Sequence, residues 1–119
     1  MPFIIKGKDA SWKEISKSVR RKVIAGKDVM VALYNAQPGP PGAPHKHDDV
    51  AQMVYLIQGK FEFEVNGEKI AAEAGDFLYF EPGVWHGGRI LGDEMAITID
   101  IFVPPMKDYL PEAVKIGKE

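Results

Sequence analysis

Three histidines and one glutamine have the residue types and the spacing of a metal site. His45 and His47 are two residues apart, which is one full side-chain period of a β-strand, so both rings point to the same side. Gln52 follows closely, and His86 lies in a second segment bounded by turn-forming glycines. The chain contains no further histidine. The three histidines are therefore the predicted ligands of one metal ion, and the Gln52 amide lies close to them in the sequence.

The predicted ligands carry no charge, and this determines what the metal can do. Three imidazoles and one amide leave a divalent cation with its whole charge, which makes it a strong Lewis acid that favours an anionic or oxygen-rich ligand. A nitrogen-rich set suits Fe, Ni, Mn, Co, Cu or Zn, and the residue types do not choose among them. With all four ligands on one side, a six-coordinate metal keeps open positions for water or substrate.

The same residues also have structural interpretations. The three histidines can be loop or core residues, and Gln52 can be an amide that supports the ligands without touching the metal. Because all three histidines of the chain fall in the two segments described above, the metal site is the favoured interpretation.

A strand predicted from Met95 to Val103 supplies a candidate acid–base group. Its odd-numbered positions are all apolar, whereas its even-numbered positions include Thr98, Asp100 and Phe102. A fully apolar face packs against another sheet or another subunit, so the mixed face is the one that lines a cavity. Asp100 is then an acid inside the barrel that can act as general acid or base. The alternatives are a solvent-facing Asp100 or an ion pair with Arg89.

The rest of the chain is predicted to form short strands joined by tight turns. Alternating and β-branched runs place further strands at 19–24, 29–34, 53–57, 61–65, 68–73 and 77–80. The first two are expected to pair as a hairpin, the apolar run at 53–57 to be buried on both faces, and Asn66-Gly67 to form a type I′ turn. Many short strands with little helix indicate a sandwich or barrel.

The two ends of the chain are predicted to flank these strands. Ser11 and Glu14 have the spacing of a capping box, so one helical turn at about 10–15 is expected to cover one end of the domain. Pro104-Pro105 ends the last strand because proline donates no ladder hydrogen bond, and the tail beyond it is expected to be frayed or dependent on a partner. Three aromatic residues near His86 are expected in the core: Tyr79, Phe80 and Trp85.

Composition limits the possible partners. A chain of 119 residues makes one domain, small enough to gain from oligomerisation. The net charge of -2, with no charge cluster, predicts no nucleic-acid partner. The absence of cysteine excludes a disulfide framework and thiolate chemistry. Residues 1–5 are too short an apolar run for a signal peptide or a membrane span, so we expect no membrane partner and a cytoplasmic location.

The two histidine segments resemble the paired motifs of the cupin family. The first runs from Gly39 to Gly59 around His45-x-His47 and Gln52, with Gln where most members carry Glu. The second runs from Gly75 through Gly83 to His86. The resemblance implies an all-β, RmlC-like fold, the cupin double-stranded β-helix or jelly-roll barrel, with the metal on His45, His47, Gln52 and His86. It implies a single cupin domain over residues 1–119, with a barrel core at about 19–105 flanked by 1–18 and 106–119.

Segments outside the motifs resemble the single-domain cupins of pectin degradation, notably Trp12-Lys13-Glu14, residues 19–23 and the stretch from Asp100 to Pro105. Members of that group convert 4,5-unsaturated monouronates, made by pectin or alginate lyases, into linear keto-sugars. The resemblance implies that the metal binds the sugar, that Asp100 shuttles protons and that Phe102 shapes the pocket.

One departure from this group concerns the substrate. The group typically carries an arginine directly after the Pro-Pro pair, where it can hold the uronate carboxylate, but this chain has Met106 there and Lys107 one position later. Three functions therefore stay open: a uronate-linearising enzyme, a dioxygenase or other redox cupin, and a non-catalytic cupin that binds a small ligand. The partner in each case is a small molecule, in the first case an anionic sugar.

The apolar strand faces predict a homodimer. Alternate residues of two predicted strands offer more apolar surface than one small barrel buries: Met53, Tyr55, Ile57, Ile97, Ile99 and Ile101.

Overall fold

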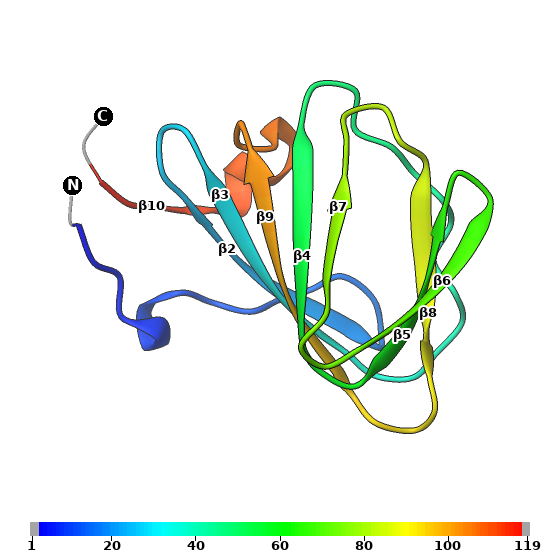
Figure 1. The fold of residues 1–119 in the computed structure, drawn as a ribbon. Helices are drawn as coiled ribbons and strands as arrows, with labels where there is room; N and C mark the ends of the chain where they lie inside the picture. The colour runs from blue at the N-terminus through cyan, green and yellow to red at the C-terminus, as the bar shows by residue number, and fades with distance from the viewer. Residues whose placement is uncertain (1–2, 118–119) are drawn as a thin grey trace.

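The computed structural model describes residues 3–117, which fold into two facing β-sheets (Figure 1). In chain order the elements are η1 (Gly7–Asp9), β1 (Lys13–Glu14), β2 (Val19–Ala25), β3 (Met30–Ala36), β4 (Ala51–Gln58), β5 (Lys60–Val65), β6 (Glu68–Glu73), β7 (Phe77–Phe80), β8 (His86–Leu91), β9 (Ala96–Val103), η2 (Lys107–Glu112) and β10 (Val114–Lys115). The larger sheet has the order β1-β2-β3-β9-β4-β7, with β10 also paired to β2, and the smaller has the order β6-β5-β8. The expected all-β jelly roll is confirmed.

Both predicted hairpins form. Strands β2 and β3 pair in antiparallel register from Val19 opposite Ala36 to Ala25 opposite Met30. Between β5 and β6, Asn66 has a φ of 49° and Gly67 a φ of 83°, the two positive values that a type I′ turn requires. Local turn chemistry therefore predicted these pairings correctly.

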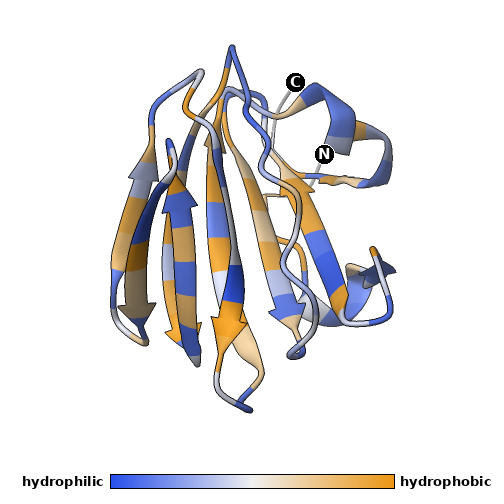
Figure 2. Cartoon of the chain, turned by 90° about the vertical axis from the view of Figure 1, so that its right-hand side faces the viewer, coloured by the Kyte–Doolittle hydropathy of each residue, from blue (hydrophilic) through white to orange (hydrophobic). Residues whose placement is uncertain are grey.

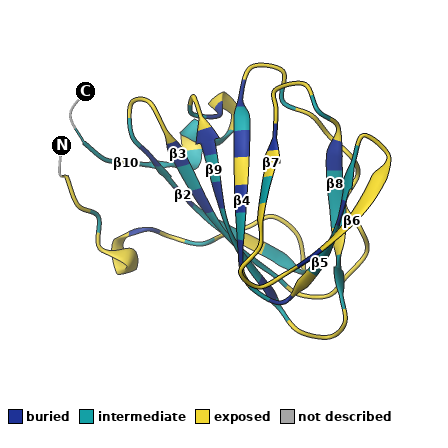
Figure 3. Ribbon diagram, in the orientation of Figure 1, coloured by how far each residue is buried: buried dark blue, intermediate teal, exposed yellow. Residues whose placement is uncertain are grey.

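Strand β4 differs from the prediction because only one of its faces is buried. Its inward residues Val54 and Leu56 are buried, whereas Met53 and Ile57 on the outer face are 43% and 42% exposed. Figure 3 shows exposed segments along β4 and the neighbouring β7. The apolar run thus has an uncovered side in the single chain.

The two ends of the chain also differ from the prediction. Lys13 and Glu14 form the short strand β1 against β2, so the predicted helical turn is wrong there, and the one short helix nearby is η1. Beyond Pro104-Pro105, η2 packs against the barrel and Val114 pairs with Ile24 of β2. Residues 106–117 are therefore a folded part of the wall rather than a frayed tail, while 1, 2, 118 and 119 lie outside the described residues.

The core consists of two clusters that meet around the predicted site. Hydrophilic and hydrophobic bands alternate along the strands (Figure 2), which is how each sheet presents one apolar face inward. The first cluster comprises Val23, Ala25, Met30, Ala32, Val50, Phe102 and Met106. The second comprises Val54, Leu56, Phe63, Ala72, Phe80 and Ala96. Among residues 3–117, three buried polar residues lie beside these clusters: Gln52, His86 and Asp100.

Candidate metal centre

The three histidines come together from two distant segments. His45 and His47 lie in the extended segment between β3 and β4, and His86 is the first residue of β8. Two backbone hydrogen bonds of 2.8 Å, one in each direction, join His45 to His86. One ring nitrogen from each histidine lies within 4.8 Å of the other two. The three imidazoles are thus positioned to hold one metal ion, as their spacing predicted.

The ring of His86 is held in a defined orientation and tautomer. It stacks on Phe80 with ring centroids 4.3 Å apart and planes 5° from parallel. Its Nδ1 lies 3.0 Å from the Val84 carbonyl oxygen, so Nδ1 carries the proton and Nε2 keeps a free lone pair. Burial, opposed by this hydrogen bond, lowers the pKa of His86 to about 4. The ring is therefore neutral at neutral pH, the form that binds a metal.

Gln52 and Asp100 lie on adjacent strands and contact each other. Gln52 Nε2 donates to Asp100 Oδ2 at 2.9 Å, and Thr98 Oγ1 donates to Asp100 Oδ1 at 2.9 Å. Burial raises the pKa of Asp100 to about 7 even though both hydrogen bonds act to lower it. Arg89 instead pairs with Glu62 across 3.2 Å, so the predicted alternative of an Arg89–Asp100 ion pair does not form.

Two buried atoms at this site have no partner among the described residues. They are Gln52 Oε1 and His86 Nε2. Buried polar atoms are normally paired, and an unpaired one costs about 1–3 kcal/mol. Both are electron-pair donors of the kinds that borderline divalent metals accept, so the residues present fit a metal ion. The set does not distinguish among the metals named above, and ligation by Gln52 stays a prediction.

These groups line a cavity between the two sheets. Its volume is about 370 Å³, within the range of roughly 300–1,000 Å³ for small-ligand pockets. Phe102 lines it and is 1% exposed, with its ring 6.2 Å from that of His47. The predicted site residues that line the cavity are His45, His47, Gln52, His86, Asp100 and Phe102.

Three further residues of the cavity wall were not identified from the sequence. Arg21 on β2, Tyr34 on β3 and Tyr109 on η2 line the same cavity. Arg21 and Tyr34 occupy directly opposed inward positions of the predicted hairpin, so strand alternation alone could have identified them. Tyr109 follows the proline pair, in a segment for which no local signal predicted packing.

The predicted core position is confirmed for one of the aromatic residues near His86 and is wrong for the other two. Phe80 is buried as predicted, whereas Tyr79 and Trp85 are 56% and 50% exposed, so their predicted core position is wrong. Met106 is buried in the first core cluster, and Lys107 is exposed at the start of η2. Neither residue is among those lining the cavity.

Comparison with known proteins gives the family and its relatives. The model of the cupin domain matches residues 32–102. The pectin degradation protein KdgF of Dickeya dadantii (strain 3937) is 35% identical over 104 residues, which cover 86% of this chain and 93% of that protein. The structure of KdgF from a Halomonas species has a TM-score of 0.78 at 30% identity, covering 91% of this chain and 96% of that one. An RmlC-like cupin from Shewanella frigidimarina has the same fold, with a TM-score of 0.81 at 24% identity and coverage of 92% and 96%.

Proposed function

This chain belongs to the cupin family, and we propose that it is a metal-dependent enzyme that converts 4,5-unsaturated monouronates into linear keto-sugars. One observation carries the proposal: a single cavity brings three imidazoles to the same place as the buried carboxyl of Asp100. The likeness to a protein named for pectin degradation supports the substrate class, since pectin breakdown yields such uronates.

We assign the metal to His45, His47 and His86, with Gln52 Oε1 as the fourth ligand. These residues would hold a divalent transition metal, which would supply Lewis-acid chemistry toward a sugar oxygen. Gln52 also acts through its amide nitrogen, which donates to Asp100 Oδ2 at 2.9 Å. The same side chain therefore links the metal ligands to the acid–base group.

Asp100 carries the proton in the proposed reaction. Ring opening removes the proton of the anomeric hydroxyl and breaks the bond between the anomeric carbon and the ring oxygen. The carbon at position 4 gains a proton, and the former ring oxygen becomes a ketone at position 5, so the step is an isomerisation that needs no co-reactant. Thr98 and Gln52 hold the two carboxyl oxygens of Asp100 in one orientation, which suits transfer between two positions of one sugar.

Phe102 shapes the pocket without taking part in proton transfer. Its ring belongs to the first core cluster, lines the cavity and lies edge-on to Tyr109, with centroids 5.7 Å apart. An apolar wall at this place excludes water from the reacting atoms.

The test follows the ultraviolet absorbance of a 4,5-unsaturated galacturonate, because ring opening removes the conjugated double bond. Zinc-loaded wild type is compared with His86→Ala and with Asp100→Asn. The matched control is Asp93→Asn, which changes an exposed carboxylate in the same way. We expect decay with wild type and Asp93→Asn only. Equal decay with Asp100→Asn, or none with metal-loaded wild type, contradicts the proposal.

The two alternative functions stay predictions. A dioxygenase would consume oxygen with its substrate, and a binding cupin would be stabilised by a ligand that it does not convert. None of the similarities reported above favours either over the sugar-opening reaction.

We propose further that the outer face of the larger sheet pairs with a second copy of this chain. Exposed apolar side chains gather there, namely Met53, Ile57, Phe77, Tyr79 and Val103. The outward positions of β4, β7 and β9 carry no charge, so the face can meet its own copy without repulsion. Sedimentation at micromolar concentration should give a dimer that Met53→Lys dissociates and that Ile70→Lys, equally exposed on the smaller sheet, does not. A monomeric wild type contradicts the pairing.

No helix within residues 3–117 is long and apolar enough to cross a membrane. The cytoplasmic location and the absence of a nucleic-acid partner stay predictions.

A further inference from the structure

Arg21 is a largely buried cation in the wall of the cavity. Its side chain is 12% exposed, and it points inward from β2 into the space that the histidines line. Arg89, the other cation among the residues lining that space, is 52% exposed and paired with Glu62. Arginine side chains are rarely buried unless they are paired, so the role of Arg21 depends on its hydrogen-bond partners.

The neighbours of Arg21 leave part of its hydrogen-bonding capacity unused. Its Nε and Nη2 donate to the two carboxylate oxygens of Glu112 at 2.6 and 3.0 Å, and Nη1 makes a long 3.5 Å contact with the Tyr34 hydroxyl. A guanidinium has five N–H groups. Two of them, on the terminal nitrogens, have no acceptor among the described residues. The edge of Arg21 away from Glu112 is thus able to receive a further carboxylate.

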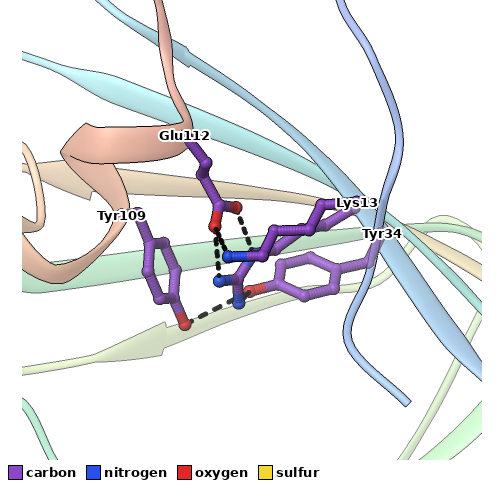
Figure 4. A network of polar contacts seen from close by, with 5 residues as sticks. Lys13, Tyr34, Tyr109 and Glu112 are labelled. Atoms are coloured by element: carbon purple, nitrogen blue, oxygen red, sulfur yellow. Dashed lines mark hydrogen bonds and ion pairs between the residues drawn. The ribbon is translucent and has the colours of Figure 1, made fainter.

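The charge around Arg21 also leaves room for one anion. Glu112 is shared, because Lys13 Nζ donates to its Oε2 at 2.9 Å (Figure 4). The cluster therefore holds two cations and one carboxylate, an excess of one positive charge. A substrate carrying one carboxylate balances that excess.

Two tyrosines extend the donor surface toward the cavity. The Tyr34 hydroxyl donates to the Tyr109 hydroxyl at 3.4 Å, and the Tyr109 proton has no acceptor among residues 3–117 (Figure 4). Burial, reinforced by Tyr109 and Asp100, raises the pKa of Tyr34 above its usual value, so the hydroxyl stays protonated. Arg21 Cζ also lies over the Tyr109 ring, 3.9 Å from its centroid. Arg21 is therefore fixed in place before any ligand arrives.

Strand register places this donor group on the same inward face of the larger sheet as the proton carrier. Arg21 pairs with Tyr34, and Tyr34 pairs with Thr98, whose hydroxyl donates to Asp100. Two strand spacings put the backbones of Arg21 and Thr98 about 10 Å apart, and Asp100 lies two residues further along β9, opposite Ala32. The long side chain of Arg21 shortens the distance to both. A hexuronate can therefore reach both groups at once.

We propose that Arg21, together with the Tyr109 hydroxyl, binds the carboxylate of an anionic sugar and so selects uronates over neutral sugars. This inference deepens the proposed function and rests on it for the substrate class. It accounts for carboxylate recognition in a chain whose Met106 lies in the core and whose Lys107 lies outside the cavity.

The test compares the binding of galacturonate and galactose to the zinc-loaded protein by titration calorimetry. These two sugars differ by a carboxylate in place of a hydroxymethyl group. We expect wild type to favour galacturonate and Arg21→Met to lose at least tenfold in that preference, since a charge-assisted hydrogen bond is worth about tenfold or more. The matched control is Arg20→Met, which removes an exposed arginine of the same strand that lies over Trp12. It should keep the wild-type preference.

The results that would refute carboxylate binding by Arg21 differ from those that would refute the proposed reaction. An unchanged preference in Arg21→Met, or no preference in wild type, overturns it. If Arg21→Met does not fold, Arg21→Lys takes its place as the test, because lysine keeps the positive charge beside Glu112 but lacks the planar guanidinium. An unchanged preference for galacturonate in Arg21→Lys also overturns the inference. With the unsaturated uronate, KM should rise tenfold at a nearly unchanged kcat. A wild type that does not turn over but prefers galacturonate through Arg21 refutes the reaction and leaves the carboxylate site standing.

Discussion

Replacing His86 with leucine should cost the metal-free protein little stability and abolish the stabilisation that a metal gives. The change removes the hydrogen bond from Nδ1 to the Val84 carbonyl oxygen and the stack on Phe80. These are worth about 1 kcal/mol each. It also removes the unpaired Nε2, whose burial costs about 1–3 kcal/mol. The net change in the free energy of unfolding without metal is therefore within about 1 kcal/mol of zero.

With metal present, wild type should be clearly more stable than His86→Leu. A metal present at one hundred times its dissociation constant adds about 2.7 kcal/mol to wild type. At ~4 °C per kcal/mol for a chain of this length, that raises Tm by about 10 °C. The variant keeps two imidazoles and should lose most of this shift.

Thermal unfolding with zinc and with a chelator measures both effects. Trp85→Leu serves as the control, because Trp85 is the exposed neighbour of His86 and should keep the wild-type shift. A loss of more than about 3 kcal/mol in chelator would show that His86 is a structural core residue, and a preserved zinc shift would remove it from the ligand set.

Three further substitutions test the scaffold. Gly59→Ala should lower the free energy of unfolding by about 1–2 kcal/mol or more, because Gly59 has a φ of +91° and a Cβ there would lie 2.9 Å from the Met95 carbonyl oxygen; an unchanged urea midpoint would argue against this geometry. Met106→Ala should cost about 2–5 kcal/mol while leaving KM unchanged, since Met106 is buried outside the cavity; a raised KM would place it in the site instead. The hydrogen bond from Arg21 is the main cause that holds the pKa of Glu112 below its usual value of 4.5. Ionised Glu112 therefore stabilises the fold at pH values above 4.5. This stabilisation is lost as the pH falls through the pKa that Glu112 has in the folded state. The stability difference between wild type and Glu112→Gln should therefore close in acid, and a constant difference from pH 7 to 3 would contradict the ion pair.

The grouping of the three histidines could be predicted because its signal is local. His45 and His47 are separated by one strand period, and the turn glycines around His86 fix where its strand begins. Asp100 could be predicted for a similar reason, since the alternation of β9 separates a mixed face from an apolar one.

The ion pair between Arg21 and Glu112 could not be predicted because the two residues are distant in sequence. Arg21 and Glu112 are 91 positions apart, and nothing near either residue indicates the other. The same holds at Lys13, where a local capping pattern is overridden by pairing with Arg21 across β1 and β2. Tertiary contacts of this kind decide how the two ends of the chain complete the cavity.

The most direct test of the account is a proton NMR time course of the 4,5-unsaturated galacturonate with zinc-loaded and metal-stripped protein. The account predicts that the vinyl proton signal at position 4 disappears and that a methylene signal of the linear ketone replaces it, with the loaded protein only. A vinyl signal that decays equally without metal, or that persists while zinc is bound at His45, His47 and His86, would contradict the claim that this site opens the uronate ring.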